Sequence, residues 1–452
     1  MNTKMKRLLL IVLCTVASLK GFSQTQPANQ TYSFTVQDAV NYAYEHRDSV
    51  VNAALDVKSA DYRVKEIIGQ GFPQIDGTAS IQDYLKIPTT LLPGEVFGAP
   101  AGTFIPVKFG VKYSSNLGVN ASQLLFDPSY IIGLQGRKTY KELYNRAYNR
   151  TKIDMNVAVT KAYYQLLVNL EQVKLLDANI AQLKQLQDQT VAQNKQGFVE
   201  KIDVDRIAVQ YNNLVTTREN TLRLLALNYQ VLKFQIGMPI EYNLTLQSVL
   251  ADVKLDENVA EMSIDTAAYR SRAEYGLLET NLRLNRFDLK RIKAQFLPTL
   301  SANAAYTFSY QNNSFGDLYS TTFPSSYIGL TLKVPIFSGF QRVNRVKQSQ
   351  ITVLKAENSL AQAKNGLNLQ AQSAKTMYFN GLQSLNNQKR SQELAREVLR
   401  VAKIKYQQGV GSSIEVTQAQ TDLQNADNQY IQGLYDALVS KVDLDRAYGR
   451  IQ

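Results

Sequence analysis

The sequence predicts a mainly α-helical chain, internally duplicated, in which each half joins a β-hairpin to a long pair of coiled-coil helices. Three observations predict this fold class. Residues 196–204 match residues 408–416 at an offset of 212, two stretches of more than 100 residues contain no proline, and the segments after Pro73 and Pro298 alternate apolar and polar residues. Repetition at a fixed offset indicates a duplicated structural unit, and the two patterns are typical of helix and strand.

The two halves differ in length in only one region. Phe126 matches Phe337 at an offset of 211, and residues 196–204 match residues 408–416 at an offset of 212. The segment from Phe126 to residue 204 therefore has almost the same length in both halves. Pro73 matches Pro298 at an offset of 225, which is about 14 residues more. We therefore expect a free loop between the two extended pieces of each half, followed by a rod of constant length.

Residues 1–23 are predicted to be a secretory signal peptide. Lys4, Lys6 and Arg7 precede an apolar run at 8–19, which is too short to span a bilayer, and small residues precede a cut before residue 24. The alternative is a buried N-terminal helix. Cys14, the only cysteine, follows a leucine rather than the small residue that a lipoprotein cut requires, so a lipid anchor is not expected.

The composition excludes several classes of function. Removal of the signal peptide would leave no cysteine, which excludes disulfide bonds and thiolate metal sites. His46 is the only histidine and is interpreted as a solvated helix residue, so no metal site, triad or cofactor is expected. The net charge of +12 is spread along the chain, and nucleic-acid binding is not expected. Motifs for a nucleophile or a phosphate loop are missing from the sequence, so it predicts no enzyme.

The proline-free arms, residues 129–238 and 336–452, are predicted to be helical, because an interior proline costs a helix about 3 kcal/mol. Each arm has one break, at Gly197 or Gly409, where the chain reverses. Residues 342–406 are expected to form one helix of about 100 Å, at 1.5 Å per residue. That length favours a coiled coil over an ordinary buried helix. The seam residues expected after the two breaks, at the 3-4 spacing of a coiled coil, are Val204, Ile207, Tyr211 and Leu214, and Val416, Ala419, Leu423, Ala426 and Tyr430.

The remaining helical segments are shorter. One helix is expected from Val36 to about Ile68, and residues 241–262 are interpreted as a polar connector that packs around the middle of the rods. The predicted organisation is a first repeat at 24–240, this connector, and a second repeat at 263–452.

Four strands in two hairpins are predicted from the alternating segments, at residues 75–81, 107–121, 300–310 and 328–334, with loops at 86–106 and 311–324. A sheet with one apolar face fits either a soluble core or a membrane barrel. The chain has no spare domain to cover the apolar face, and four strands cannot close a barrel, so several chains are expected to contribute strands. Aromatic residues near the strand ends would suit a membrane girdle; they are Tyr84, Tyr113, Tyr310, Phe315, Tyr319 and Phe323.

The order of these elements, present twice, resembles the outer-membrane efflux protein family, the TolC-like channels. The motifs that carry the resemblance are Phe-Pro-Gln-Ile at 72–75, Gln-Leu-Leu-Phe-Asp at 123–127, Pro-Ile-Phe-Ser-Gly at 335–339, the paired Gly-x-x-x-x-Ile-[Asp/Glu]-Val tips, and Leu-Asp-Arg-Ala-Tyr-Gly at 444–449. The resemblance implies a homotrimer with a shared transmembrane β-barrel of about 12 strands in the outer-membrane lipid. It also implies a long α-helical coiled-coil barrel that extends into the periplasm.

As to function, the resemblance implies the outer-membrane exit duct of a tripartite efflux system. Such a duct passively conducts substrates delivered by an inner-membrane pump through a periplasmic adaptor protein. One alternative is the outer-membrane channel of a one-step protein secretion system. An alternative of another class is a periplasmic structural or adaptor coiled-coil protein, although adaptor rods are not usually duplicated.

The resemblance also assigns candidate site residues. Acidic residues just after the second tip ring the periplasmic entrance in the family, and the matching positions are Glu415 and Gln418, with Asp203 and Arg206 in the first copy. Three converging Glu415 carboxylates would attract cations. The alternative is that Glu415 stabilises the N-terminus of its own helix. Glycines at the tips are expected to take the left-handed cap conformation, and these turns are candidates for adaptor docking.

Overall fold

A computed structural model describes residues 31–98, 100–248, 250, 253, 255 and 268–451. The predicted signal peptide lies outside the described residues. The chain divides into two compact units. The coil unit comprises residues 1–47, 158–256 and 384–439, and the sheet unit comprises residues 48–157, 257–383 and 440–452.

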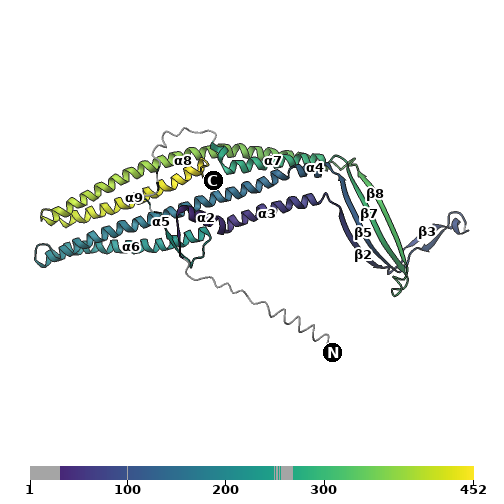
Figure 1. Ribbon diagram of the computed structural model, residues 1–452, viewed down its shortest axis with the longest axis horizontal. Helices are drawn as coiled ribbons and strands as arrows, with labels where there is room; N and C mark the ends of the chain where they lie inside the picture. Colours follow the sequence, from purple (N-terminus) through teal and green to yellow (C-terminus); the bar gives the residue numbers. More distant parts are fainter. Residues whose placement is uncertain are drawn as a thin grey trace, which may run out of the picture. The chain divides into compact units, whose positions relative to one another are not determined.

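The sheet unit contains one four-stranded antiparallel sheet (Figure 1). Its strands, in spatial order, are β2 (Gln74–Asp83), β5 (Tyr113–Phe126), β7 (Thr299–Asn312) and β8 (Thr322–Lys333). The pairing of β5 with β7 joins the two repeats, and Val119 lies opposite both Gly77 and Tyr306. Residues paired directly across a sheet share a face, so the apolar sets of the first three strands lie on one side. Three of the four predicted strands are confirmed, and the strand predicted at 107–121 is found only from Tyr113 onward.

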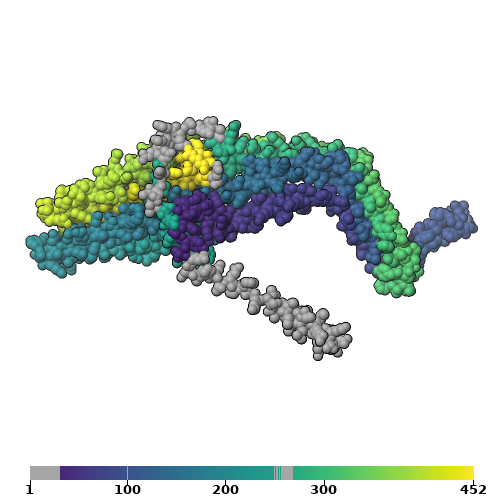
Figure 2. Space-filling model, in the orientation of Figure 1, coloured from purple at the N-terminus to yellow at the C-terminus, as the bar shows by residue number. Residues whose placement is uncertain are grey.

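The prediction of a free loop at 86–106 is wrong in one respect, because this segment contains regular secondary structure. It contains a second hairpin of β3 (Thr89–Pro93) and β4 (Phe104–Lys108), joined through the 3-10 turn η1 (Gly94–Phe97). The hairpin extends from the end of the sheet opposite the helices (Figures 1 and 2). The predicted return strand from residue 107 is therefore split. Gly110, with φ of 127°, separates β4 from β5, since a residue at positive φ interrupts an extended strand.

The helices of the sheet unit meet the sheet at one end. They are α3 (Asp48–Gly69), α4 (Pro128–Gln135), α7 (Ala273–Ala294) after the 3-10 turn η4 (Ala268–Ser271), and the first parts of α5 (Arg137–Lys195) and α8 (Gln341–Gln407). The Asp127 side chain accepts hydrogen bonds from the backbone N–H groups of Ser129 and Tyr130 and so caps α4. None of the helices in the described parts of the chain is both long and apolar enough to cross a membrane.

The helix predicted from Val36 to about Ile68 is two helices. In the coil unit, α2 (Val36–His46) ends at Arg47, whose backbone is extended with φ of −76° and ψ of 123°. The Arg47 guanidinium donates a 2.7 Å hydrogen bond to the Phe234 carbonyl oxygen and lies 4.5 Å from the centre of the Phe234 ring. A contact with a residue distant in the sequence therefore accompanies the break.

The coil unit is built from two helical hairpins. One is formed by α5 and α6 (Lys201–Ile236), the other by α8 and α9 (Ser413–Ala447). The predicted long helix is confirmed, because α8 is continuous over 67 residues. The connector includes β6 (Asn243–Leu246), which pairs in parallel with β1 (Thr31–Phe34). Its apolar residues Leu250, Val253 and Leu255 pack against a buried cluster of the coil, as expected.

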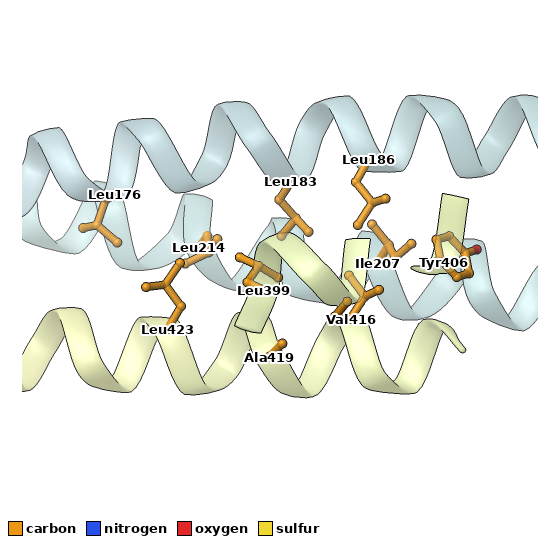
Figure 3. Packing of buried hydrophobic residues seen from close by; sticks show 11 residues of the cluster. Leu176, Leu183, Leu186, Ile207, Leu214, Leu399, Tyr406, Val416, Ala419 and Leu423 are labelled. Atoms are coloured by element: carbon orange, nitrogen blue, oxygen red, sulfur yellow. The ribbon is translucent and has the colours of Figure 1, made fainter. Parts of the chain in front are cut away.

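Apolar residues from all four helices meet between the two hairpins (Figure 3). Ile207 and Leu214 of α6 are fully buried there, and Val416 and Leu423 of α9 are 1% and 2% exposed. The cluster confirms the predicted seam at Ile207, Leu214, Val416, Ala419 and Leu423, and Tyr211 packs against it. Of the other predicted seam residues, Ala426 is buried and Tyr430 packs against a second cluster, whereas Val204 belongs to neither of these clusters. The remaining members of the first cluster are Leu176, Leu183, Leu186, Leu399, Ala402 and Tyr406.

The duplication is repeated in the backbone geometry. Gly197 and Gly409 have φ of 79° and 74°, and Gly237 and Gly449, which end α6 and α9, have φ of 77° and 67°. In each case the following residue donates its N–H to a carbonyl five residues earlier, for example Phe198 to Gln193. This bond satisfies a carbonyl at the helix end. The predicted left-handed caps are therefore confirmed.

Candidate channel entrance and coil tips

The tips of both hairpins expose apolar side chains beside their glycines. Phe198 is 77% exposed and Val410 is 78% exposed. A Cβ atom added at Gly197 or Gly409 would meet nothing within 4 Å. Positive φ, rather than crowding, therefore requires glycine at the tips, and an exposed apolar residue follows each one.

Glu415 and Gln418 lie together on the wall of a groove between α8 and α9, with a volume of about 600 Å³. The Ser412 hydroxyl accepts a hydrogen bond from the Glu415 N–H, so a serine provides the side-chain cap of α9. The Glu415 carboxylate is exposed and has no hydrogen-bond or ion-pair partner among the described residues. Its position in the first turn suits the helix dipole, and its charge is also available to the groove.

Asp203 and Arg206 are engaged elsewhere. The Ser413 hydroxyl donates a hydrogen bond to the Asp203 carboxylate, and the Arg206 Nη1 atom lies 3.4 Å from the Ser413 Oγ atom and 3.6 Å from the Asp203 Oδ1 atom. These two residues therefore link α6 to the start of α9. They do not line the groove that holds Glu415 and Gln418.

Asp422 is a groove residue that sequence reasoning missed. It lies on the same wall, and its Oδ1 atom accepts a 2.9 Å hydrogen bond from the Gln418 Nε2 atom. Asp422 follows Glu415 by seven residues, so both point from the same face of α9. The heptad spacing could have revealed it. Asp422, one turn of α9 beyond Gln418, therefore provides the acidic side chain that was expected at position 418.

A second groove, of about 520 Å³, lies between α5 and α8 near the tips and was also missed. Hydrogen bonds of 3.2 Å from Lys403 Nζ to Gln182 Oε1 and of 3.0 Å from Gln407 Nε2 to Gln189 Oε1 cross it. Burial lowers the pKa of Lys403. Arg396 also lines the groove. The recurrence of glutamine at 182 and 189 is the sequence signal that could have indicated a polar groove.

A second apolar stripe runs along α6 on the side away from the seam. Leu224, Leu227, Val231 and Phe234 follow a 3-4-3 spacing and are 57%, 53%, 41% and 62% exposed. This spacing is that of a coiled-coil face. Apart from Arg47, which lies against the Phe234 ring, the described chain leaves this face open.

Aromatic residues are exposed at both ends of the sheet. Of the predicted girdle residues, Tyr84, Phe315, Tyr319 and Phe323 are exposed, whereas Tyr113 and Tyr310 are half-buried. A second set, at the end that meets the helices, was missed. It consists of Phe72, Phe126, Phe296, Phe337 and Phe340, which are 45% to 77% exposed.

In the described parts of the chain, no cluster of histidine, cysteine, aspartate or glutamate is arranged to hold a metal ion.

Comparison with known proteins identifies the class to which this architecture corresponds. Residues 279–450 match the model of the family described as Outer membrane efflux protein. The chain is 20% identical to the outer membrane protein TolC of Vibrio cholerae over 74% of this chain and 76% of that protein. It is 23% identical to the probable efflux pump outer membrane protein TtgC of Pseudomonas putida over 87% and 78%.

Solved structures share the fold. A structure of CusC superposes with a TM-score of 0.73 at 17% identity and covers 95% of this chain and 96% of that one. The outer membrane channel CmeC of Campylobacter jejuni gives a TM-score of 0.71 at 16% identity over 92% and 85%. The resemblance expected from the sequence is confirmed. The chain is therefore similar in sequence to outer-membrane efflux proteins and TolC, and similar in fold to outer-membrane channels.

Proposed function

We propose that this protein is the trimeric exit duct of a tripartite efflux system, which passively conducts substrates received from an inner-membrane pump through a periplasmic adaptor. The observation that carries the proposal is the four-stranded sheet with two unpaired edges, β2 and β8, in a chain similar to outer-membrane efflux proteins. An edge strand presents unsatisfied N–H and C=O groups, which are costly in lipid. Pairing of β8 with the β2 strand of a neighbouring copy removes both edges, and three copies supply twelve strands.

The side chains of the edge strands support this assembly. Every residue of β2 is exposed, and so is nearly every residue of β8. Their apolar members include Ile75 at 69%, Ile328 at 89% and Leu330 at 70%. Large apolar exposure of this kind marks an interaction surface, and lipid on one face of the sheet accounts for it.

The exposed stripe of α6 supports contacts between copies along the rods. One face of α6 already packs in the seam between the two hairpins. Apolar residues at coiled-coil spacing on its opposite face indicate a second helical neighbour. A neighbouring copy would cover Leu224 and Leu227, and the rods would then close into a tube.

Adaptor docking is assigned to the groove between α5 and α8, with the exposed tips around Gly197 and Gly409 at its end. The groove presents glutamine amides and the partly desolvated ammonium of Lys403. Amides and cations of this kind match a helical partner that brings polar and acidic side chains. Relatives described as efflux pump outer membrane proteins support a pump as the final partner.

The test of the duct is assembly and conductance. Outer membranes extracted with detergent should yield a species of three chains that forms ohmic pores in planar bilayers. A soluble periplasmic monomer would rule the proposal out. Affinity purification after crosslinking in cells should recover an adaptor protein and a pump, and Lys403→Glu should reduce this recovery whereas Lys389→Glu, away from the groove, should not.

The entrance assignment has its own test. Three Glu415 carboxylates near a common axis would bind divalent cations and favour monovalent cations over anions. Glu415→Ala should weaken the block by divalent cations, and Gln418→Glu should strengthen it. Asp203→Asn serves as the control, because Asp203 bonds to Ser413 rather than facing the groove. An unchanged block in Glu415→Ala would reject the ring.

A further inference from the structure

Phe340, which immediately precedes α8, adopts a backbone conformation that is costly for its residue type. Its φ is 62°, and in the described parts of the chain it is the only residue other than glycine with a positive φ. Gly339 before it has φ of 56°, and the Gln341 N–H donates a 3.1 Å hydrogen bond to the Ser338 carbonyl oxygen. Turns with two successive positive φ angles favour glycine or asparagine. The turn therefore holds a phenylalanine at a position that disfavours it.

Contacts within the chain do not account for this phenylalanine. Phe340 is 66% exposed, and its ring meets only the edge of another exposed ring, that of Phe337, at a centroid distance of 5.7 Å. Strained residues concentrate at functional sites, where the surroundings hold them in place. An exposed ring kept at a conformational cost indicates a partner outside the chain.

The matching turn of the first repeat lacks this feature. At the offset of 211, Phe340 matches Ser129, which lies in the first turn of α4. Asp127 caps α4 directly, and no residue at positive φ intervenes. The two turns differ in their place in the sheet, because β5 is a central strand whereas β8 is an edge (Figure 1). The strained phenylalanine therefore follows the strand whose edge is open.

Phe72 occupies the corresponding place at the other edge of the sheet. It lies between α3 and β2 and is 62% exposed. The Gln123 Nε2 atom donates a 2.6 Å hydrogen bond to the Gly71 carbonyl oxygen, and the Gln74 Nε2 atom donates one of 2.9 Å to the carbonyl oxygen of the next residue. A Cβ atom at Gly71 would lie 2.3 Å from the Tyr130 hydroxyl oxygen. Phe72 is therefore an exposed ring on a turn that the chain holds firmly.

The register of the sheet shows which residues meet when further copies close it. Within the chain, Gln74 lies level with Gly329, through the pairs that link β2, β5, β7 and β8. Strands of closed barrels tilt by about 35 to 45°. At about 4.8 Å between strands and about 3.3 Å per residue, four strand spacings displace the register by about four to six residues. Gln74 of the next copy is then level with residues 333–335.

The direction of this displacement follows from the helices. The opposite direction would leave the start of β2 beside the far end of β8, so that the helices of neighbouring copies would leave the barrel at different ends. With β2 and β8 joined at the helical end, Phe72 of the next copy is level with residues 335–337. The exposed rings of the two edges therefore lie at the same level.

We infer that the Phe337 and Phe340 rings of one copy pack against the Phe72 ring of the next, so that three aromatic contacts join the copies where the sheet meets the helices. The inference rests on the proposed function, because it requires β8 to pair with β2 of a neighbour. Aromatic pairs stabilise an interface beyond the area that they bury. A slip of two residues keeps every strand side chain on its own face, so these rings also select the register between copies.

Paired cysteines test the contact in the full-length trimer, since the sequence after the predicted signal peptide contains no cysteine. Phe72→Cys combined with Phe337→Cys, treated with a short bismaleimide, should give covalent dimers and trimers on denaturing gels. In one chain these positions lie at opposite edges, three strand spacings or about 14 Å apart, so a short linker joins them only between copies. Phe296→Cys with Phe337→Cys is the control, because β7 and β8 are neighbours within one chain and should give no covalent oligomer.

Single substitutions separate a contact between copies from an aromatic residue that faces lipid. Phe340→Ala and Phe72→Ala should lower the temperature at which trimers separate in detergent gels. Phe340→Gly should lower it as much as Phe340→Ala, although it suits the positive φ, because the ring makes the contact. Phe296→Ala removes an exposed ring at the same end of the sheet, but beside a central strand, and should leave the temperature unchanged.

Two results would overturn the inference alone, provided that the trimers still form ohmic pores. One is the absence of covalent oligomers from the pair at 72 and 337, and the other is an equal effect of Phe340→Ala and Phe296→Ala. Recovery of the wild-type protein as a soluble monomer would reject the proposed function as well.

Discussion

Glu274 and Arg272 form a nearly buried ion pair at the start of α7. The Arg272 side chain is 4% exposed, and its Nη2 and Nε atoms donate hydrogen bonds of 2.8 and 3.1 Å to the Glu274 carboxylate. Burial acts to raise the pKa of Glu274, but the hydrogen bonds and positive charges of Arg272 and Arg446 outweigh it and lower the pKa to about 2. The folded protein therefore strongly favours the ionised carboxylate.

This pair predicts a pH-dependent stability. Because the folded pKa lies below the usual value of 4.5, the contribution of Glu274 is fully present above pH 4.5 and is lost as the pH falls toward 2. The shift corresponds to about 3 kcal/mol. Glu274→Gln should lower the unfolding free energy by this amount at pH 7, and the difference from wild type should shrink below pH 4.5 in thermal unfolding. Glu397→Gln, which alters an exposed pair with Arg400, should change stability little at any pH.

The four positive-φ glycines at matching positions predict unequal costs of substitution. A non-glycine residue in the left-handed region costs about 1 to 2 kcal/mol, and this applies at Gly197 and Gly409, where the surroundings are open. At Gly237 a Cβ atom would lie 2.6 Å from the His46 carbonyl oxygen. Gly237→Ala should therefore lower the unfolding midpoint more than Gly197→Ala. Equal midpoints would mean that the backbone moves to relieve the contact.

At the scale of the element, the coiled coil contains a buried polar layer. The matching positions of the first repeat do not form such a layer. Asp427 of α9 is 6% exposed and accepts hydrogen bonds of 2.7 Å from Asn179 of α5 and Gln392 of α8. At the offset of 212, Asp427 and Gln392 match Val215 and Ile180. The layer therefore joins the two hairpins by hydrogen bonds at a level where the repeat has apolar residues.

The polar layer predicts a non-additive series of substitutions. Asp427→Val alone leaves two buried amides without their acceptor and should cost about 1 to 3 kcal/mol. The triple change Asn179→Leu, Gln392→Ile and Asp427→Val replaces the whole layer with apolar residues and should restore or exceed wild-type stability. Chemical denaturation of the three proteins measures this. A triple variant less stable than the single one would show that apolar side chains do not pack at this level.

At the scale of the whole molecule, assembly should depend on side chains that the single chain leaves exposed. Leu227 of α6 is 53% exposed, whereas its neighbour Leu225 is 9% exposed. Leu227→Glu should leave the secondary structure intact but lower the temperature at which trimers separate in detergent gels, because it places a charge between copies. Leu225→Glu should instead impair folding of the chain itself. Unchanged trimer stability in Leu227→Glu would exclude this face from the interface.

Site residues set by local backbone geometry could be predicted from the sequence, whereas those that depend on distant hydrogen-bond partners could not. The tip glycines followed from local backbone geometry, and their caps were found as expected. Glu415 and Gln418 were placed on one groove wall, but Asp203 and Arg206 bond to Ser413, a partner 210 and 207 residues away in the sequence. Pattern analysis along one chain does not indicate which distant side chain completes a hydrogen bond.

The duplication, the rods, their seam and the four strands could be derived from the residues alone, because period, proline placement and turn glycines act over a few neighbouring positions. The β3–β4 hairpin, the break at Arg47, the grooves at the tips and the polar layer at Asp427 emerged only with the fold. Each of them depends on side chains brought together from segments far apart, and their contacts, rather than any local preference, set the geometry.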